Sequence, residues 1–186
     1  MVRCFIAIEL PESIRAALAC WIEQLRTTST RATWARAEHM HLTLRFLGNV
    51  PEDQISSIDA QLRASLITVS PFMLSIGGIG AFPSPAKPNV VWAGVQSPDG
   101  TLLNLQSLCE NAARSAGLPP ETRAFHPHIT LARIKEAEPA TQLACAIDAM
   151  RERMVDEFEA TAVSLFESKL TAHGPVHTRL QEYPFK

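Results

Sequence analysis

One short phrase occurs twice in this sequence, as His-Met-His-Leu-Thr-Leu at residues 39–44 and as His-Pro-His-Ile-Thr-Leu at residues 126–131. Each copy lies in an apolar run with β-branched or aromatic neighbours, which is typical of a short strand. Alternate side chains of a strand share a face. The residues that share the polar face are His41 with Thr43 and His128 with Thr130. Two such strands, facing each other, would line a cleft with two imidazoles and two hydroxyls.

Hydrophobic periodicity and turn residues divide the rest of the chain into strands and helices. The sequence predicts strands at residues 3–10, 40–47, 72–82, 89–95, 126–133 and 158–171, and a last strand that follows a turn at 173–175 and ends near Leu180. It predicts helices at residues 12–26, 51–66, 102–112 and from Pro139 to about 150, with a stiff surface loop at 83–88.

The predicted order is strand, helix, histidine strand, helix, strand, strand, and then helix, histidine strand, helix, strand, strand, so the second half echoes the first. We therefore expect an α+β fold class, with one bilobal domain over residues 1–186 and an internal pseudo-repeat marked by the motifs at 41–44 and 128–131. Its two pseudo-symmetric, antiparallel-rich sheets would carry outer helices and enclose a central cleft.

The bulk composition limits the function. With 46% hydrophobic and 19% charged residues, the chain has the composition of a globular protein. A formal net charge of −2 argues against sequence-blind binding to long nucleic acid, which needs a basic excess, but not against recognition of an RNA end. Four scattered cysteines without a C-x-x-C pair are expected to be reduced.

No stretch approaches the roughly 20 apolar residues that cross a bilayer. The N-terminal apolar run is interrupted by Glu9 and stopped by Pro11, so it does not resemble a signal peptide. We expect a cytoplasmic protein without a membrane partner. A monomer is the default, because no unpaired amphipathic stretch demands a partner.

The repeated residues suit phosphoester cleavage without a metal. Histidine has a pKa near 6.5, so one imidazole can take a proton from the attacking oxygen while another gives one to the leaving oxygen. Threonine hydroxyls on the same face can donate to phosphate oxygens. A single H-x-T arises by chance in many strands, but two copies at corresponding places indicate a shared site. The candidate catalytic residues are His41, Thr43, His128 and Thr130.

Four other residues are candidate substrate contacts. Arg45 is expected on the face of His41, and Arg133 follows the second motif, so either guanidinium could hold a phosphate. Phe46 is also placed on the His41 face, where it could stack on a base, with ordinary packing as the equal alternative. His126 is a further possible substrate contact.

Zinc is the competing reading of the same histidines. His39 shares a face with His41, and His126 with His128, so four imidazoles could in principle bind a zinc ion. However, no acidic residue lies beside either motif to orient the ring nitrogens, as metal sites usually require. His39 is better read as a bystander. We expect no metal and no other cofactor.

With these residues in view, the chain resembles the bacterial and archaeal RNA 2′,3′-cyclic phosphodiesterases, the LigT-like or 2′-5′ RNA ligase family of two-histidine phosphoesterases. The resemblance covers nearly the whole chain, and the matching stretches are 3–11, 41–48, 91–94, 125–133, the strand around 165–170 and the Gly174-Pro175 hairpin. The tail departs from the family, because relatives commonly carry a tyrosine where this chain has His177. The resemblance therefore does not extend to substrate contacts from this hairpin. His173 and His177 are expected to be exposed, because they lie near a turn.

The resemblance implies hydrolysis of a terminal 2′,3′-cyclic phosphate on RNA or a nucleoside to a 2′-phosphate, without metal or ATP, and a reverse 2′-5′ RNA ligase activity. It implies His128 as the base and His41 as the acid, although the sequence is symmetric on this point. Arg133 carries over as a phosphate contact. The alternatives are a non-catalytic module of the same fold that binds RNA or nucleotide ends, a hydrolase of another small cyclic phosphate, and the zinc hydrolase.

Overall fold

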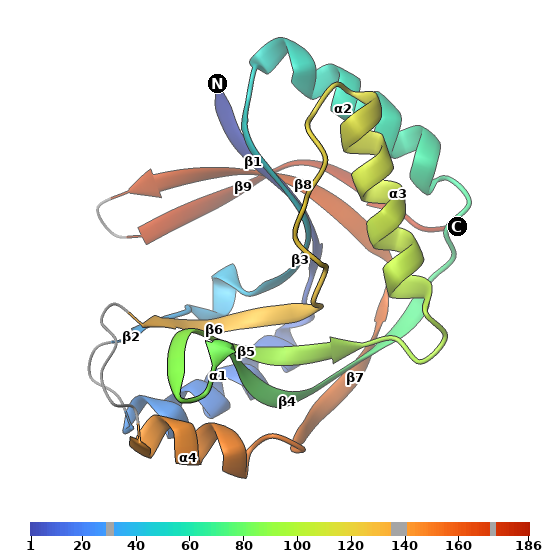
Figure 1. Cartoon of the computed structure of the whole chain (residues 1–186). Helices are drawn as coiled ribbons and strands as arrows, with labels where there is room; N and C mark the ends of the chain where they lie inside the picture. Colours follow the sequence, from blue (N-terminus) through green and yellow to red (C-terminus); the bar gives the residue numbers. More distant parts are fainter. Residues whose placement is uncertain (29–31, 135–140, 172–173) are drawn as a thin grey trace.

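The structure is a computed structural model that describes residues 1–28, 32–134, 141–171 and 174–186. Within these residues two antiparallel sheets form the centre of the molecule, and helices pack outside them (Figure 1). The helices are α1 (Glu12–Arg26), α2 (Glu52–Leu66), α3 (Thr101–Ser115) and α4 (Thr141–Ala149), with a 3₁₀ turn η1 (Ala37–His39). No helix in this part of the chain is long and apolar enough to span a membrane.

The strands divide between the sheets in the order β3-β1-β8-β9 and β2-β6-β5-β4-β7. Their bounds are β1 (Val2–Glu9), β2 (Ala32–Trp34), β3 (His41–Val50), β4 (Phe72–Ser84), β5 (Lys87–Gln96), β6 (His128–Ile134), β7 (Met154–Ala160), β8 (Ala162–Thr171) and β9 (Gly174–Pro184). Each histidine strand, β3 or β6, pairs with the strand that precedes it by one helix. Four strands of one sheet thus correspond to four of the other, with β2 added, and the predicted fold class is confirmed.

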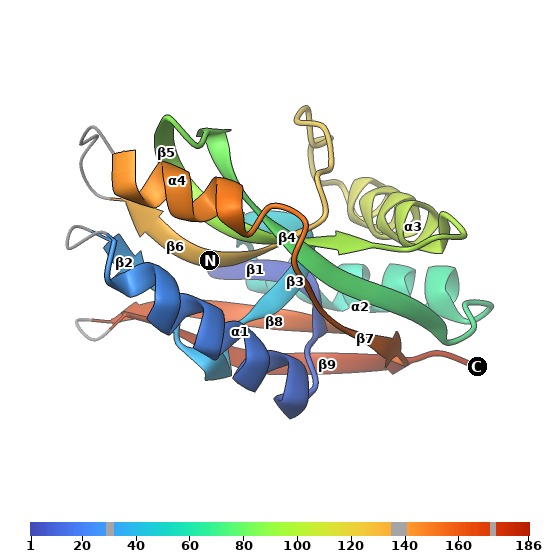
Figure 2. The ribbon, with the colours of Figure 1, turned by 90° about the horizontal axis from the view of Figure 1, so that it is seen from below.

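The helices do not simply cover the sheet of their own half. Helix α1 leads from β1 of the first sheet to β2 of the second, and it packs against β2 and β7 of the second sheet. Helix α3 connects two strands of the second sheet and packs against β3 and α2 (Figures 1 and 2). The buried stripe of α1 consists of Ile14, Leu18, Trp21, Ile22 and Leu25. These residues join a single apolar cluster that includes both sheets, so the two lobes share one core.

The second histidine strand begins at His128 and the last strand ends at Pro184, and two other predicted elements differ more from the structure. The strand expected at 158–171 breaks at Thr161, because β7 belongs to the second sheet and β8 to the first. A half-buried strand shows the same alternation of apolar and polar residues in either sheet. The sequence therefore does not indicate where the chain passes from one sheet to the other. The expected loop at 83–88 is mostly paired, since Pro83 faces Pro88 and Ser84 faces Lys87 across a tight hairpin. The expected helix start at Pro139 lies outside the described residues.

Candidate active site

Each histidine strand contains a β-bulge at the last residue of its motif. In β3, the pairing with β1 passes over Leu44, which lies between Thr43 and Arg45. In β6, the pairing with β5 passes over Leu131 in the same way. Such a bulge reverses the alternation of side chains beyond it. The His and Thr of each motif therefore share one half-buried face, and the residues that follow change face.

The bulge in β3 overturns the expectation for Arg45. Its side chain is only 7% exposed and forms ion pairs with Glu110 of α3 and, at 3.6 Å, with Glu121. It also donates hydrogen bonds of 2.6 Å to the carbonyl oxygens of Phe46 and Pro119. The prediction that Arg45 shares the His41 face is wrong, because the extra residue turns it toward α3. Its guanidinium is already engaged within the protein.

The same reversal brings a different residue of each strand onto the histidine face. Strict alternation would place Phe46 on the face of the strand that does not carry His41. The bulge returns Phe46 to the His41 face, where it packs with the cluster of Phe5 and Phe166. Its role in base stacking remains a prediction. Arg133 occupies the corresponding place on β6, five residues after its histidine, and is exposed.

Both motif histidines are anchored through the same ring nitrogen. His41 Nδ1 lies 2.8 Å from the carbonyl oxygen of His39, and His128 Nδ1 lies 2.6 Å from that of His126. A carbonyl oxygen only accepts hydrogen bonds, so Nδ1 must carry the hydrogen in each ring. The other nitrogen, Nε2, is left to take up or release a proton. The repeat therefore reproduces an acid–base tautomer as well as a sequence.

The His41 ring lies in an aromatic setting. It stacks on Phe5 with a centroid distance of 4.6 Å and an interplanar angle of 26°. His177 meets it edge-on at 5.3 Å, so the expectation that His177 is simply exposed is wrong. The pKa of His41 is lowered to about 4, chiefly by burial, and the charges of His177 and His39 contribute to the lowering. The hydrogen bond to the His39 carbonyl and the charge of Glu9 act in the opposite direction.

His128 has a matching but more open setting. The Phe82 ring meets it edge-on at 5.1 Å, and the Trp92 ring lies 6.4 Å away. Burial lowers the pKa of His128, and the positive charge of Arg133 adds to this effect. The charge of Arg133 is therefore near enough to act on the His128 ring, and a phosphate contact by Arg133 stays a prediction. The side chain of Trp92 lies across Gly80, where a Cβ atom would come within 2.2 Å of the indole ring.

Acidification is expected to destabilise the fold through His41. Its pKa is 6.5 in the reference state and about 4 in the folded protein, so between these values the unfolded chain binds a proton that the folded chain does not. Stability should therefore fall as the pH is lowered from about 6.5 toward 4, by an amount on the order of 3 kcal/mol. Denaturant unfolding at pH 7 and pH 4.5 measures the loss. His41→Phe should show a smaller loss, and an equal loss would contradict this explanation.

The remaining predicted residues lie around these two rings. His126 is exposed, and its ring lies 5.9 Å from Phe82. The His39 ring meets that of His177 at 5.5 Å, and its assignment as a bystander to the chemistry stays a prediction. Among the described residues, no three His, Cys, Asp or Glu side chains are placed to hold a metal ion. His173 lies outside these residues.

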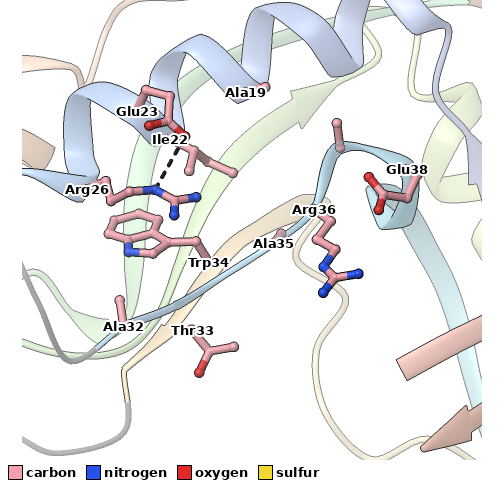
Figure 3. Close-up of a pocket in the computed structure, with 11 residues that line it drawn as sticks. Ala19, Ile22, Glu23, Arg26, Ala32, Thr33, Trp34, Ala35, Arg36 and Glu38 are labelled. Atoms are coloured by element: carbon pink, nitrogen blue, oxygen red, sulfur yellow. Dashed lines mark ion pairs between the residues drawn. The ribbon is translucent and has the colours of Figure 1, made fainter. Parts of the chain in front are cut away.

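A hollow of about 680 Å³ lies between α1 and the segment around β2. The Trp34 ring lies beside Arg26, which forms a 3.3 Å ion pair with Glu23 on the same helix (Figure 3). Its lining residues are Ala19, Ile22, Glu23, Arg26, Ala32, Thr33, Trp34, Ala35, Arg36, Ala37 and Glu38. None of the motif residues contributes to it. The hollow therefore lies apart from the motif residues of the two histidine strands.

Comparison with known proteins agrees with this geometry. The sequence profile of the 2′-5′ RNA ligase superfamily matches residues 10–171. The chain belongs to this superfamily. Its relatives include the RNA 2′,3′-cyclic phosphodiesterases of Methanothermobacter thermautotrophicus, 32% identical over 98% of both chains, and Thermotoga maritima, 34% identical over 99% of this chain and 96% of the relative. That of Aeropyrum pernix is 38% identical over 78% of this chain and 81% of its own.

Solved structures show the same superfamily fold. A Thermus thermophilus protein superposes with a TM-score of 0.83 at 27% identity, covering 98% of this chain and 97% of its own. Escherichia coli LigT in complex with 3′-AMP superposes with a TM-score of 0.78 at 25% identity, covering 100% of this chain and 98% of its own. The superfamily fold therefore extends over the whole chain, including the terminal hairpin.

Proposed function

We propose that this member of the superfamily is a metal-independent RNA 2′,3′-cyclic phosphodiesterase, which hydrolyses a terminal 2′,3′-cyclic phosphate to a 2′-phosphate. The observation that carries the proposal is the repeated anchoring of His41 and His128, each through Nδ1 to a carbonyl two residues earlier. Two imidazoles held with Nε2 available are what a concerted acid and base require. The names of the relatives point to the same substrate.

The proposed reaction uses one proton transfer at each histidine. Nε2 of His128 removes a proton from water as the water oxygen attacks the phosphorus. The bond from phosphorus to the 3′ oxygen breaks, and that oxygen takes a proton from His41. The product keeps its phosphate on the 2′ oxygen. Thr43 and Thr130 donate hydrogen bonds to the non-bridging oxygens, and Arg133 offsets their negative charge.

The lowered pKa values bear on this assignment. A lowered pKa keeps His128 neutral near pH 7, as a base requires. His41 must instead be protonated, although its pKa is about 4 in the empty site. A phosphodiester anion beside the ring favours the charged form and raises that pKa. We therefore propose that substrate binding itself promotes protonation of His41.

Ligation follows from the same geometry. If the 5′ hydroxyl of a second RNA takes the place of water, the attack on the same phosphorus expels the same 3′ oxygen and leaves a 2′-5′ linkage. No further catalytic group is required. We propose RNA ends or nucleoside 2′,3′-cyclic phosphates as the substrates of a monomeric, cytoplasmic enzyme.

The deciding experiment is a turnover assay on nucleoside 2′,3′-cyclic phosphates and a cyclic-phosphate-ended RNA, in the presence of a metal chelator. We expect a 2′-phosphate product at the same rate with and without chelator. Loss of turnover in chelator, restored by zinc, would support a zinc hydrolase instead. Saturable binding without product would indicate the binding module. Activity confined to other small cyclic phosphates would show that the proposed substrate is wrong, while the proposed two-histidine mechanism would still apply.

A further inference from the structure

His177 lies against the ring of His41, although it belongs to β9, the edge strand at the other side of the first sheet. Strand β9 pairs with β8, and β8 with β1, so two strands separate His177 from the strand of His41. The His177 ring nevertheless meets the His41 ring at 5.3 Å and an angle of 88°. It also meets Phe5 edge-on at 5.0 Å. His177 therefore contacts both members of the stacked pair of His41 and Phe5.

These contacts complete the support of the His41 ring. Phe5 covers one face of the imidazole, and the His39 carbonyl fixes Nδ1. The edge of His177 is the third contact. We propose that His177 is a positioning residue of the active site, which holds the His41 ring against Phe5 and competes with His41 for a proton. The effect on turnover rests on the proposed function, whereas the ring contact and the proton competition do not.

The charged and titratable groups around His41 come from three elements. Glu9 of β1 favours its protonation, but that carboxylate is shared with Arg179 at 2.9 Å. His39 of η1 and His177 of β9 both oppose it. Imidazolium groups about 5 Å apart repel each other, so the first to take a proton suppresses protonation of its neighbour.

His177 itself favours the neutral form in this structure. Burial lowers its pKa first, and the charge of His39 lowers it further. Its Nδ1 atom is buried without a hydrogen-bond partner among the described residues. An unpartnered buried nitrogen is less costly as a neutral acceptor than as a charged donor. A neutral His177 does not oppose protonation of His41, whereas a charged His177 lowers the pKa of the catalytic ring by repulsion.

The competition between His177 and His41 for a proton can be measured in the absence of substrate. We would follow the ring Cε1–H signal of His41 by NMR during pH titration of the wild type, His177→Phe and the control Thr178→Val. Phenylalanine keeps an aromatic edge but cannot take a proton, so the pKa of His41 should rise by about half a pH unit or more. Thr178 is an exposed neighbour on the same strand, and its replacement should leave the titration as in the wild type. Equal titration of His41 in the wild type and His177→Phe would overturn the competition.

Positioning is tested by comparing two ring replacements. His177→Ala removes the edge contact and should lower kcat about tenfold, since small misplacements of a catalytic group are costly. His177→Phe should keep kcat within about twofold at its pH optimum. Equal kcat in both variants would overturn the positioning role. If no variant and not even the wild type turned over a cyclic phosphate, the proposed function would fail, while the NMR titration would still decide the competition.

Discussion

Replacing either motif histidine by alanine is expected to lower kcat on a cyclic phosphate by about 10²–10⁴-fold, the usual contribution of a positioned acid or base. The double variant should be little slower than either single variant, because both histidines act in one step. Among the described residues, the hydrogen bond of each ring runs from Nδ1 to a backbone carbonyl two residues earlier and not to another side chain, so we expect the fold to stay in place when the ring is removed. Wild-type turnover by either variant would exclude the two-histidine mechanism.

The choice of leaving group can tell the acid from the base. An aryl phosphodiester with an activated leaving group needs little protonation of its departing oxygen. If His41 is the acid, His41→Ala should recover most of its rate on that substrate, whereas His128→Ala should stay slow on both. The opposite pattern would exchange the two roles. The circular dichroism spectrum and unfolding temperature of each variant serve as controls for folding.

The sequence alone predicts the motif faces and the general architecture, because both follow from local rules. The repeated His-x-Thr fixes a period of two, and apolar residues between polar ones fix the buried side. The succession of strands and helices then suggests two related sheets. Helix α1 shows where this reasoning ends. Its apolar stripe is evident, but nothing local says that the stripe packs on the sheet of the other lobe.

The predicted positions of Arg45 and His177 are wrong for two different physical reasons. A bulge is a mismatch between two strands, so the sequence of β3 alone does not contain the slip at Leu44 that turns Arg45 into the protein. His177 depends on how a whole sheet curves, since its partner His41 lies three strands away in the order β3-β1-β8-β9. Glu110 and Glu121 are the sequence features that are compatible with a buried Arg45, because a buried arginine needs carboxylate partners.

Replacing Arg45 by methionine is expected to lower the free energy of unfolding by about 3–5 kcal/mol, the usual cost of removing one partner from a buried ion pair. The carboxylate of Glu110 is only 18% exposed and depends on this guanidinium. Glu121 would keep Arg123, which contacts it at 2.8 Å. The cost should therefore arise mainly at Glu110, and denaturant unfolding at pH 7 measures it.

The double variant Arg45→Met with Glu110→Gln separates this structural role from a catalytic one. Neutralising Glu110 removes the unpaired buried charge, so the double variant should regain part of the lost stability. Turnover below the unfolding temperature should match the wild type in both variants, since Arg45 points away from the histidine face. A methionine variant with wild-type stability but impaired turnover would instead make Arg45 a substrate contact. That result would require the β3 bulge to rearrange when a phosphate binds, because only a shifted register returns position 45 to the face of His41.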